Sequence, residues 1–123
     1  MSIRLYGIPN CDTVKKARAW LDGLGLSYHF HDYKKAGVDE DTLRGWVASE
    51  GWETVLNRQG TTFRKLPDDQ RHVTGADQAL AVMLANPSAI KRPIVEYGND
   101  ADCGVLVGFD PVRWSTALEG ELT

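Results

Sequence analysis

Apolar and polar positions at the start of the chain follow the pattern of a strand, a helix and a second strand. Residues 3–6 predict a short buried strand, and residues 7–10 predict the turn after it. Apolar residues then recur at helical spacing behind Cys11. The expected buried stripe of this helix consists of Val14, Ala17, Leu21 and Leu24. The alternation over residues 28–33 predicts a second strand, so the three elements form a βαβ unit with parallel strands.

The middle of the chain predicts short helices joined by polar loops. Residues 34–38 and residues 60–62 predict loops. The acidic residues 39–41 suit the start of a helix, and residues 52–56 predict another short one. Thr74 is the expected cap of a third helix. This segment therefore predicts a helical insertion between two groups of strands.

The last third of the chain predicts a hairpin and a final helix. Residues 93–97 and 104–109 predict two strands, and their short connection makes them antiparallel. Asp110 followed by proline predicts a capped helix, with Val112, Leu118 and Trp114 as its expected inward side chains. The order of elements predicts an α/β protein with a thioredoxin/glutaredoxin-like fold. We expect one domain over residues 1–123, with a four-stranded mixed sheet, flanking helices and a helical insertion.

Composition excludes several classes of protein. The chain has 123 residues and a net charge of −3, so nothing in its overall charge favours nucleic acid or a membrane surface as a partner. No apolar stretch is long enough to span a bilayer, and the first residues lack the pattern of a signal peptide. Two distant cysteines do not form a disulfide framework. We therefore expect a cytoplasmic monomer with reduced thiols.

Cys11 is the main candidate for chemistry, because it lies between the first predicted strand and helix. Unpaired backbone N–H groups and the helix dipole favour the thiolate there, and the thiolate is the nucleophile. The alternative is a small buried hydrophobic residue. Val14 stands where two-cysteine thioredoxin-like proteins carry a resolving thiol. Cys103 could replace that thiol, although packing or a surface position is the simpler interpretation of it.

Basic residues and histidines give further candidates. Arg58 and Arg92 could bind an anion through their planar donors, although a solvated surface charge is the simpler interpretation of any single arginine. The bond between Arg92 and Pro93 could be cis. His29 and His31 share a strand face, but no further ligand follows at a diagnostic spacing. We therefore expect no metal site.

Several motifs in order resemble the arsenate reductase (ArsC) family, and most closely its Spx/YffB branch. They are Leu5 to Ala17 around Cys11, Phe30 to Tyr33, Leu56 to Arg58, Gly60 to Leu66 and Ile90 to Ile94. The resemblance implies a thioredoxin-like fold and a nucleophilic Cys11. It implies that Arg58 and Arg92 frame an anion, that Pro93 follows a cis bond, and that Asn10 and Thr13 help to bind substrate.

The chain also departs from the family's arsenate reductases. These carry His and Asn where this chain has Gly7 and Ile8, and they have a third arginine that residues 105–110 lack. The resemblance therefore favours a glutathione-dependent thiol reductase, with glutathione as co-substrate, glutaredoxin as a possible partner and no tightly bound cofactor. The alternatives are a true arsenate reductase coupled to glutathione and glutaredoxin, an Spx-like regulator that binds RNA polymerase without catalysis, and a family member without turnover.

Overall fold

A computed structural model describes residues 2–99 and 102–119, and the chain divides into two compact units. The first unit holds a four-stranded sheet in the order β2-β1-β3-β4. Its strands are β1 (Ser2–Gly7), β2 (His29–Asp32), β3 (Ile94–Asn99) and β4 (Asp102–Val107). β1 pairs with β2 in parallel, whereas β3 runs antiparallel to both β1 and β4. The predicted α/β fold with a mixed sheet is confirmed.

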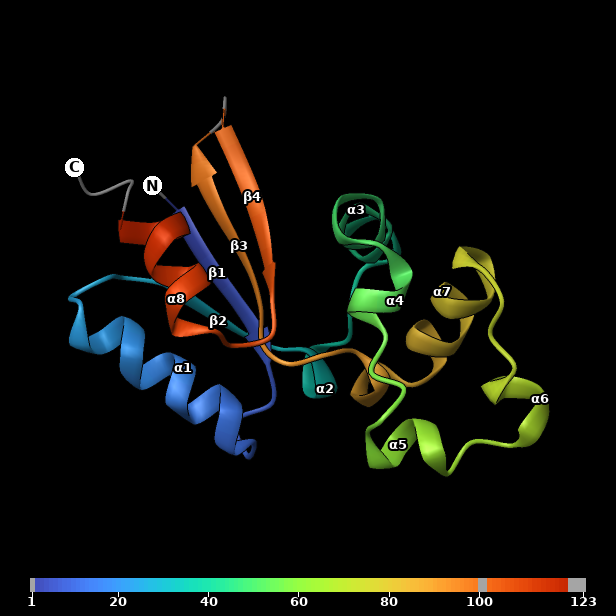
Figure 1. Cartoon of the computed structure of the whole chain (residues 1–123). Coiled ribbons are helices and arrows are strands. Elements are labelled where there is room, and N and C mark those ends of the chain that lie inside the picture. Colours follow the sequence, from blue (N-terminus) through green and yellow to red (C-terminus); the bar gives the residue numbers. More distant parts are fainter. Residues whose placement is uncertain (1, 100–101, 120–123) are drawn as a thin grey trace. The chain divides into compact units, whose positions relative to one another are not determined.

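Helices α1 (Asp12–Gly23) and α8 (Pro111–Trp114) lie against the same face of this sheet (Figure 1), and the π-helical turn η2 (Ser115–Glu119) continues α8. Alternate residues of β1 point into the space between sheet and helices, as the period of a strand requires. The buried residues of this core are Ile3, Leu5, Val14, Ala17, Leu21, Val95, Leu106, Trp114 and Leu118. Burial of this apolar surface is the main stabilising contribution to the unit.

The second unit, residues 34–91, is helical. Its helices are α3 (Glu40–Glu50), α4 (Trp52–Val55), α5 (Thr61–Arg64), α6 (Asp68–Arg71) and α7 (Ala76–Ala85), followed by the 3-10 turn η1 (Pro87–Ala89). The predicted start of α3 is confirmed, because the side chain of Asp39 accepts a hydrogen bond from the backbone N–H of Thr42. The expected helical insertion is therefore present. That the two units form one domain stays a prediction.

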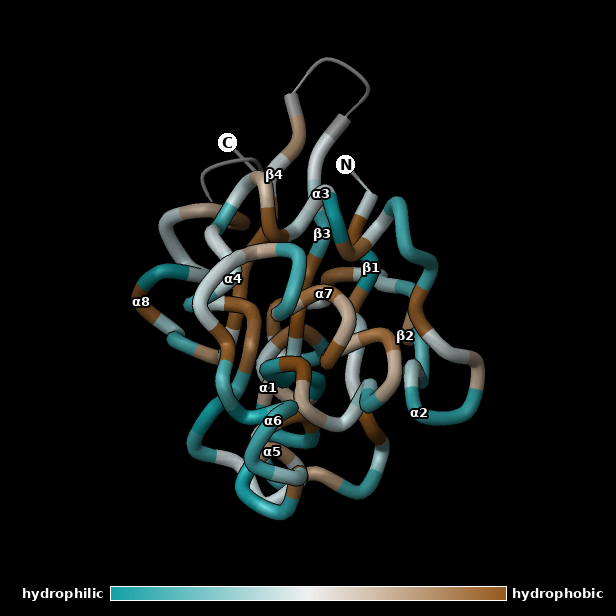
Figure 2. Tube along the Cα trace, turned by 90° about the vertical axis from the view of Figure 1, so that its right-hand side faces the viewer, coloured by the Kyte–Doolittle hydropathy of each residue, from teal (hydrophilic) through white to brown (hydrophobic). Residues whose placement is uncertain are grey.

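Three predicted loops and caps are wrong. Residues 33–36 form the one-turn helix α2 (Tyr33–Ala36), and α5 begins inside the predicted loop of residues 60–62. α6 was not expected at all; it buries none of its side chains, and its trace is largely hydrophilic in Figure 2. Such turns carry no apolar period that could predict them. Gly75, not Thr74, caps α7, because the hydroxyl of Thr74 instead donates a hydrogen bond to Gln78.

Two side chains expected in the core are exposed. Leu24 is 37% exposed because α1 ends one residue earlier, at Gly23. Val112 is 75% exposed, although Asp110 caps α8 as predicted and Trp114 and Leu118 are buried. A helix of one turn can direct few side chains to one face, and the large ring of Trp114 takes that place.

Candidate functional site

Cys11 lies in the turn between β1 and α1, where it is the N-cap residue of the helix. Its backbone is extended, with φ −118° and ψ 126°, and its carbonyl oxygen accepts a hydrogen bond of 2.9 Å from the N–H of Lys15. The side chain makes no capping hydrogen bond and is half-buried. The sulfur is therefore not used to cap the helix, and it lies where the helix dipole favours negative charge.

Strand directions bring three chain segments to the edge of the sheet where Cys11 lies. β1 and β2 are parallel, so Gly7 and Asp32 end side by side. β3 is antiparallel, so its first residue, Ile94, pairs with Tyr6 near the same end. Arg92 lies two residues before the first residue of β3 and is half-buried. The topology thus places Arg92 at the same edge as the Cys11 turn.

Tyr33 is a member of this site that the sequence analysis missed. Its side chain is fully buried. Burial raises the pKa of its hydroxyl above the ordinary value, the charge of Arg92 opposes this rise in pKa, and Cys11 and Asp32 add to it. Tyr33 directly follows β2, whose last residue, Asp32, pairs with Gly7, so the strand pairing places Tyr33 at the same edge of the sheet as the Cys11 turn. Part of the signal was available from the sequence, because Tyr33 is the last residue of the strand predicted over residues 28–33, parallel to β1, but the register of that strand was not.

The peptide bond between Arg92 and Pro93 is cis, as the resemblance implied. Pro93 is buried, and its carbonyl oxygen accepts a hydrogen bond of 2.9 Å from the N–H of Gly108. This bond ties the start of β3 to the chain just after β4. The backbone that directly follows Arg92 is therefore held in place.

The other predicted site residues fall into two groups. Asn10 lies in the turn before Cys11 and Thr13 in the first turn of α1, and both are exposed. Arg58 belongs to the second unit, where it follows α4, and is exposed. The substrate-binding roles of these residues stay predictions.

Cys103 lies far from Cys11 within the first unit. It pairs with Gly98 on the neighbouring strand, and Gly98 pairs with Ser2 at the beginning of β1. Gly7 is at the other end of β1, about 17 Å away at the rise of a strand. Two cysteines form a disulfide only when their Cα atoms lie within about 7 Å. Cys103 therefore cannot resolve a disulfide at Cys11 in this fold.

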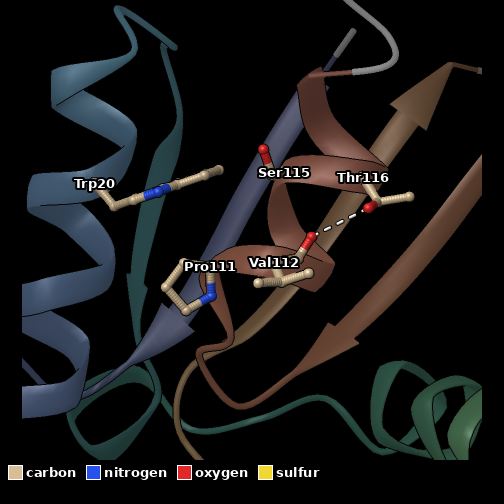
Figure 3. A pocket seen from close by; sticks show the side chains of 5 residues that line it. All are labelled: Trp20, Pro111, Val112, Ser115 and Thr116. Carbon is tan, nitrogen blue, oxygen red and sulfur yellow. Dashed lines mark hydrogen bonds between the residues drawn. The ribbon is translucent and has the colours of Figure 1, made fainter.

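A shallow pocket lies between α1 and α8 (Figure 3). Its lining residues are Trp20, Pro111, Val112, Ser115 and Thr116. Trp20 lies in the second half of α1, about 13 Å along the helix axis from Cys11. Its indole makes edge-on contacts with the rings of Trp114 and Phe109. The pocket thus borders an aromatic cluster of the core and does not include the candidate nucleophile.

Neither a metal centre nor a membrane span is found in the part of the chain that the structure describes. Residues 2–99 and 102–119 contain no group of three or more metal-ligating side chains. His31 instead places its ring against that of Tyr6, with 4.9 Å between the ring centroids. None of the helices in these ranges has the length and apolar character needed to cross a bilayer.

The chain is similar to a known protein family, to several known proteins and to several solved structures. The ArsC family model matches residues 6–117. A solved structure of the YffB (PA3664) protein is similar with a TM-score of 0.88 and 51% identity, over 95% of this chain and 99% of that one. An uncharacterized protein of Haemophilus influenzae is 36% identical over 116 residues, which cover 94% of this chain and 98% of that protein. The global transcriptional regulator Spx of Streptococcus pyogenes is more distant, with 26% identity over 95 residues that cover 76% of this chain and 70% of Spx.

Proposed function

Because the chain belongs to the ArsC family, we propose that it is a glutathione-dependent thiol reductase with Cys11 as its single nucleophile. One observation carries the proposal: Cys11 caps the 12-residue helix α1 without using its side chain, at the edge of the sheet to which the strand pairing also brings Arg92 and Tyr33. A helix N-terminus and a guanidinium both favour a thiolate. This combination is suited to attack on a sulfur atom, with no metal or redox cofactor required.

The proposed reaction proceeds by two thiol–disulfide exchanges. The Cys11 thiolate attacks one sulfur of a small disulfide, forms a mixed disulfide and expels the other half as a thiolate, which takes a proton from solvent. A glutathione thiolate then attacks the sulfur bonded to Cys11 and restores the Cys11 thiolate. The mixed disulfide released in this step reacts with a second glutathione. The substrate disulfide is thereby reduced to two thiols, and two glutathione molecules are oxidised to one disulfide.

A resolving partner from outside the chain is required, because position 14 is a buried valine and Cys103 lies at the other end of the sheet. Glutathione is a suitable partner, since its carboxylates can accept charge-assisted hydrogen bonds from arginine, and Arg92 and Arg58 are each a proposed donor. Glutaredoxin is a second possible donor of the resolving thiol. Asn10 and Thr13 are exposed beside Cys11 and supply polar groups for the substrate.

Arsenate is the less favoured substrate for this chain. A small doubly charged oxyanion needs several donors that converge on it. The chain has Gly7 and Ile8 where the family's arsenate reductases carry His and Asn, and residues 105–110 contain no arginine. One lost charge-assisted hydrogen bond of about 1.5–3 kcal/mol lowers the rate roughly ten- to more than a hundredfold. We therefore expect arsenate turnover near background.

The test is a panel of small disulfides and arsenate, assayed with glutathione alone and with glutathione plus glutaredoxin. The proposal predicts turnover of disulfides by the wild-type protein that is lost in Cys11→Ser and kept in the matched control Cys103→Ser. Efficient arsenate reduction would favour the arsenate reductase alternative. Equal activity of wild type and Cys11→Ser on every substrate would refute the enzyme proposal. The next alternative to test would then be an Spx-like regulator, by measuring binding to RNA polymerase.

A further inference from the structure

Arg58 and Trp52 form a contact that the proposed chemistry does not yet use. The guanidinium carbon of Arg58 lies over the ring of Trp52, at 5.4 Å from the ring centroid. Both residues belong to the second unit, and Trp52 is half-buried while Arg58 is exposed. An exposed arginine normally samples many rotamers, so a ring beneath its guanidinium restricts it.

The turn that carries Arg58 has a fixed shape. The side-chain oxygen of Asn57 accepts a hydrogen bond of 3.2 Å from the backbone N–H of Gln59. A Cβ atom on Gly60 would lie 2.6 Å from the side-chain nitrogen of Asn57, so only glycine fits there without a shift. These features close the turn tightly around Arg58.

Backbone hydrogen bonds hold both ends of this arrangement. The N–H of Asn57 donates to the carbonyl oxygen of Ala89 at 2.8 Å, and the N–H of Leu56 donates to that of Trp52 at 2.9 Å. Leu56 is buried and forms a β-bridge with Ile90. The first residue of α4 and the turn after α4 are therefore fixed relative to each other, and this geometry sets the ring beneath the guanidinium.

We propose that Trp52 is a positioning residue, which orients the guanidinium of Arg58 for a carboxylate of glutathione or of a glutathione-like disulfide. The inference rests on the proposed function, because that function assigns anion binding to Arg58. A ring contact covers the flat face of a guanidinium, whereas its N–H donors point outward in its plane. The stack thus restricts the side chain and leaves the donor edge suited to a carboxylate, which lowers the ordering cost of binding.

The kinetic test compares Trp52→Leu with Trp52→Phe in the reduction of a small disulfide by glutathione. An exposed cation–π contact corresponds to about a two- to fivefold effect on binding. We expect Trp52→Leu to raise the KM for glutathione by about that factor with little change in kcat, and Trp52→Phe to restore most of it. In an Arg58→Ala background, Trp52→Leu should have no further effect. Trp20→Leu is the matched control, because that indole contacts Phe109 and Trp114 in the other unit.

A second readout separates the failure of this inference from that of the proposed function. The NMR signals of the Arg58 side chain should be shifted upfield by the Trp52 ring in the wild-type protein, whether or not it is an enzyme. Titration with oxidised glutathione should move the Arg58 Nε–H signal, with two- to fivefold weaker binding in Trp52→Leu. Absence of the ring shift, or equal affinity and KM in wild type and Trp52→Leu, would overturn the role of Trp52. A missing turnover with an intact shift and titration would overturn only the reductase proposal.

Discussion

Replacement of Gly7 by alanine tests how closely the end of β1 approaches α1 beside the Cys11 turn. A Cβ atom at position 7 would lie 2.8 Å from Cγ2 and 3.2 Å from Cγ1 of Val14. Carbon atoms in contact normally lie about 3.5–4.0 Å apart. The side chain of Val14 is fully buried and, because it is β-branched, has little freedom to rotate away. The added methyl group must therefore push the strand and the helix apart.

Overpacking of this kind costs about 1–3 kcal/mol of the free energy of unfolding. Val14→Ala alone should cost about 2 kcal/mol, because two buried methyl groups at about 0.8 kcal/mol each are lost and a cavity remains. In the double variant the clash disappears and the new methyl group fills part of that cavity. The double variant should then lose at least about 1 kcal/mol less than the sum of the two single losses.

Urea denaturation of the wild type, the two single variants and the double variant measures these free energies. The reasoning is wrong if Gly7→Ala stays within about 0.5 kcal/mol of the wild type, or if the two losses simply add. The result also bears on function. The family's arsenate reductases carry a histidine at this place, and Val14 leaves no room for its Cβ atom in this chain.

Two further predictions concern Tyr6 and Arg92. Burial and the 2.7 Å hydrogen bond to Glu96 raise the pKa of Tyr6 to about 12. The raised pKa means that the contribution of protonated Tyr6 to stability is complete below about pH 10, the ordinary pKa of tyrosine, and is lost as pH rises through 12. The fall in the free energy of unfolding between about pH 10 and pH 12 should therefore be smaller in Tyr6→Phe than in the wild type. An equal fall in both proteins would contradict the raised pKa of Tyr6. Arg92→Ala should lower the kcat/KM for disulfide reduction by roughly ten- to a hundredfold. The control variant Lys65→Ala changes an exposed residue of the second unit and should leave kcat/KM unchanged. A similar kcat/KM in both variants would exclude a role for Arg92.

Much of the first unit follows from local sequence patterns. The apolar stripe of Val14, Ala17 and Leu21 determines where α1 packs, and Asp110 before a proline marks the start of α8. The short connection between the last two strands predicts their antiparallel pairing. From these patterns the position of Cys11 at the start of a helix could be predicted. The arginine roles came from the resemblance, and the geometry supports only that Arg92 lies at the same edge of the sheet as the Cys11 turn.

Other features depend on contacts that no local pattern contains. Tyr33 joins the site because two parallel strands end side by side, which requires the register of Gly7 with Asp32. Val112 stays exposed because Trp114 takes the inward position of a one-turn helix. The Trp52–Arg58 stack depends on a turn shape that is set by one side-chain hydrogen bond of Asn57 and by backbone hydrogen bonds of residues 56 and 57. These are effects of tertiary contacts, and such contacts override the local helix and strand propensities on which a prediction from sequence rests.

Mass spectrometry after incubation with oxidised glutathione tests the central claim most directly, namely that Cys11 is a nucleophile without an internal resolving thiol. The account predicts one glutathione adduct per chain on the peptide that contains Cys11. The adduct should be absent in Cys11→Ser, retained in Cys103→Ser and released by free glutathione. An adduct on Cys103 alone, a disulfide between Cys11 and Cys103, or no adduct at all would contradict the account.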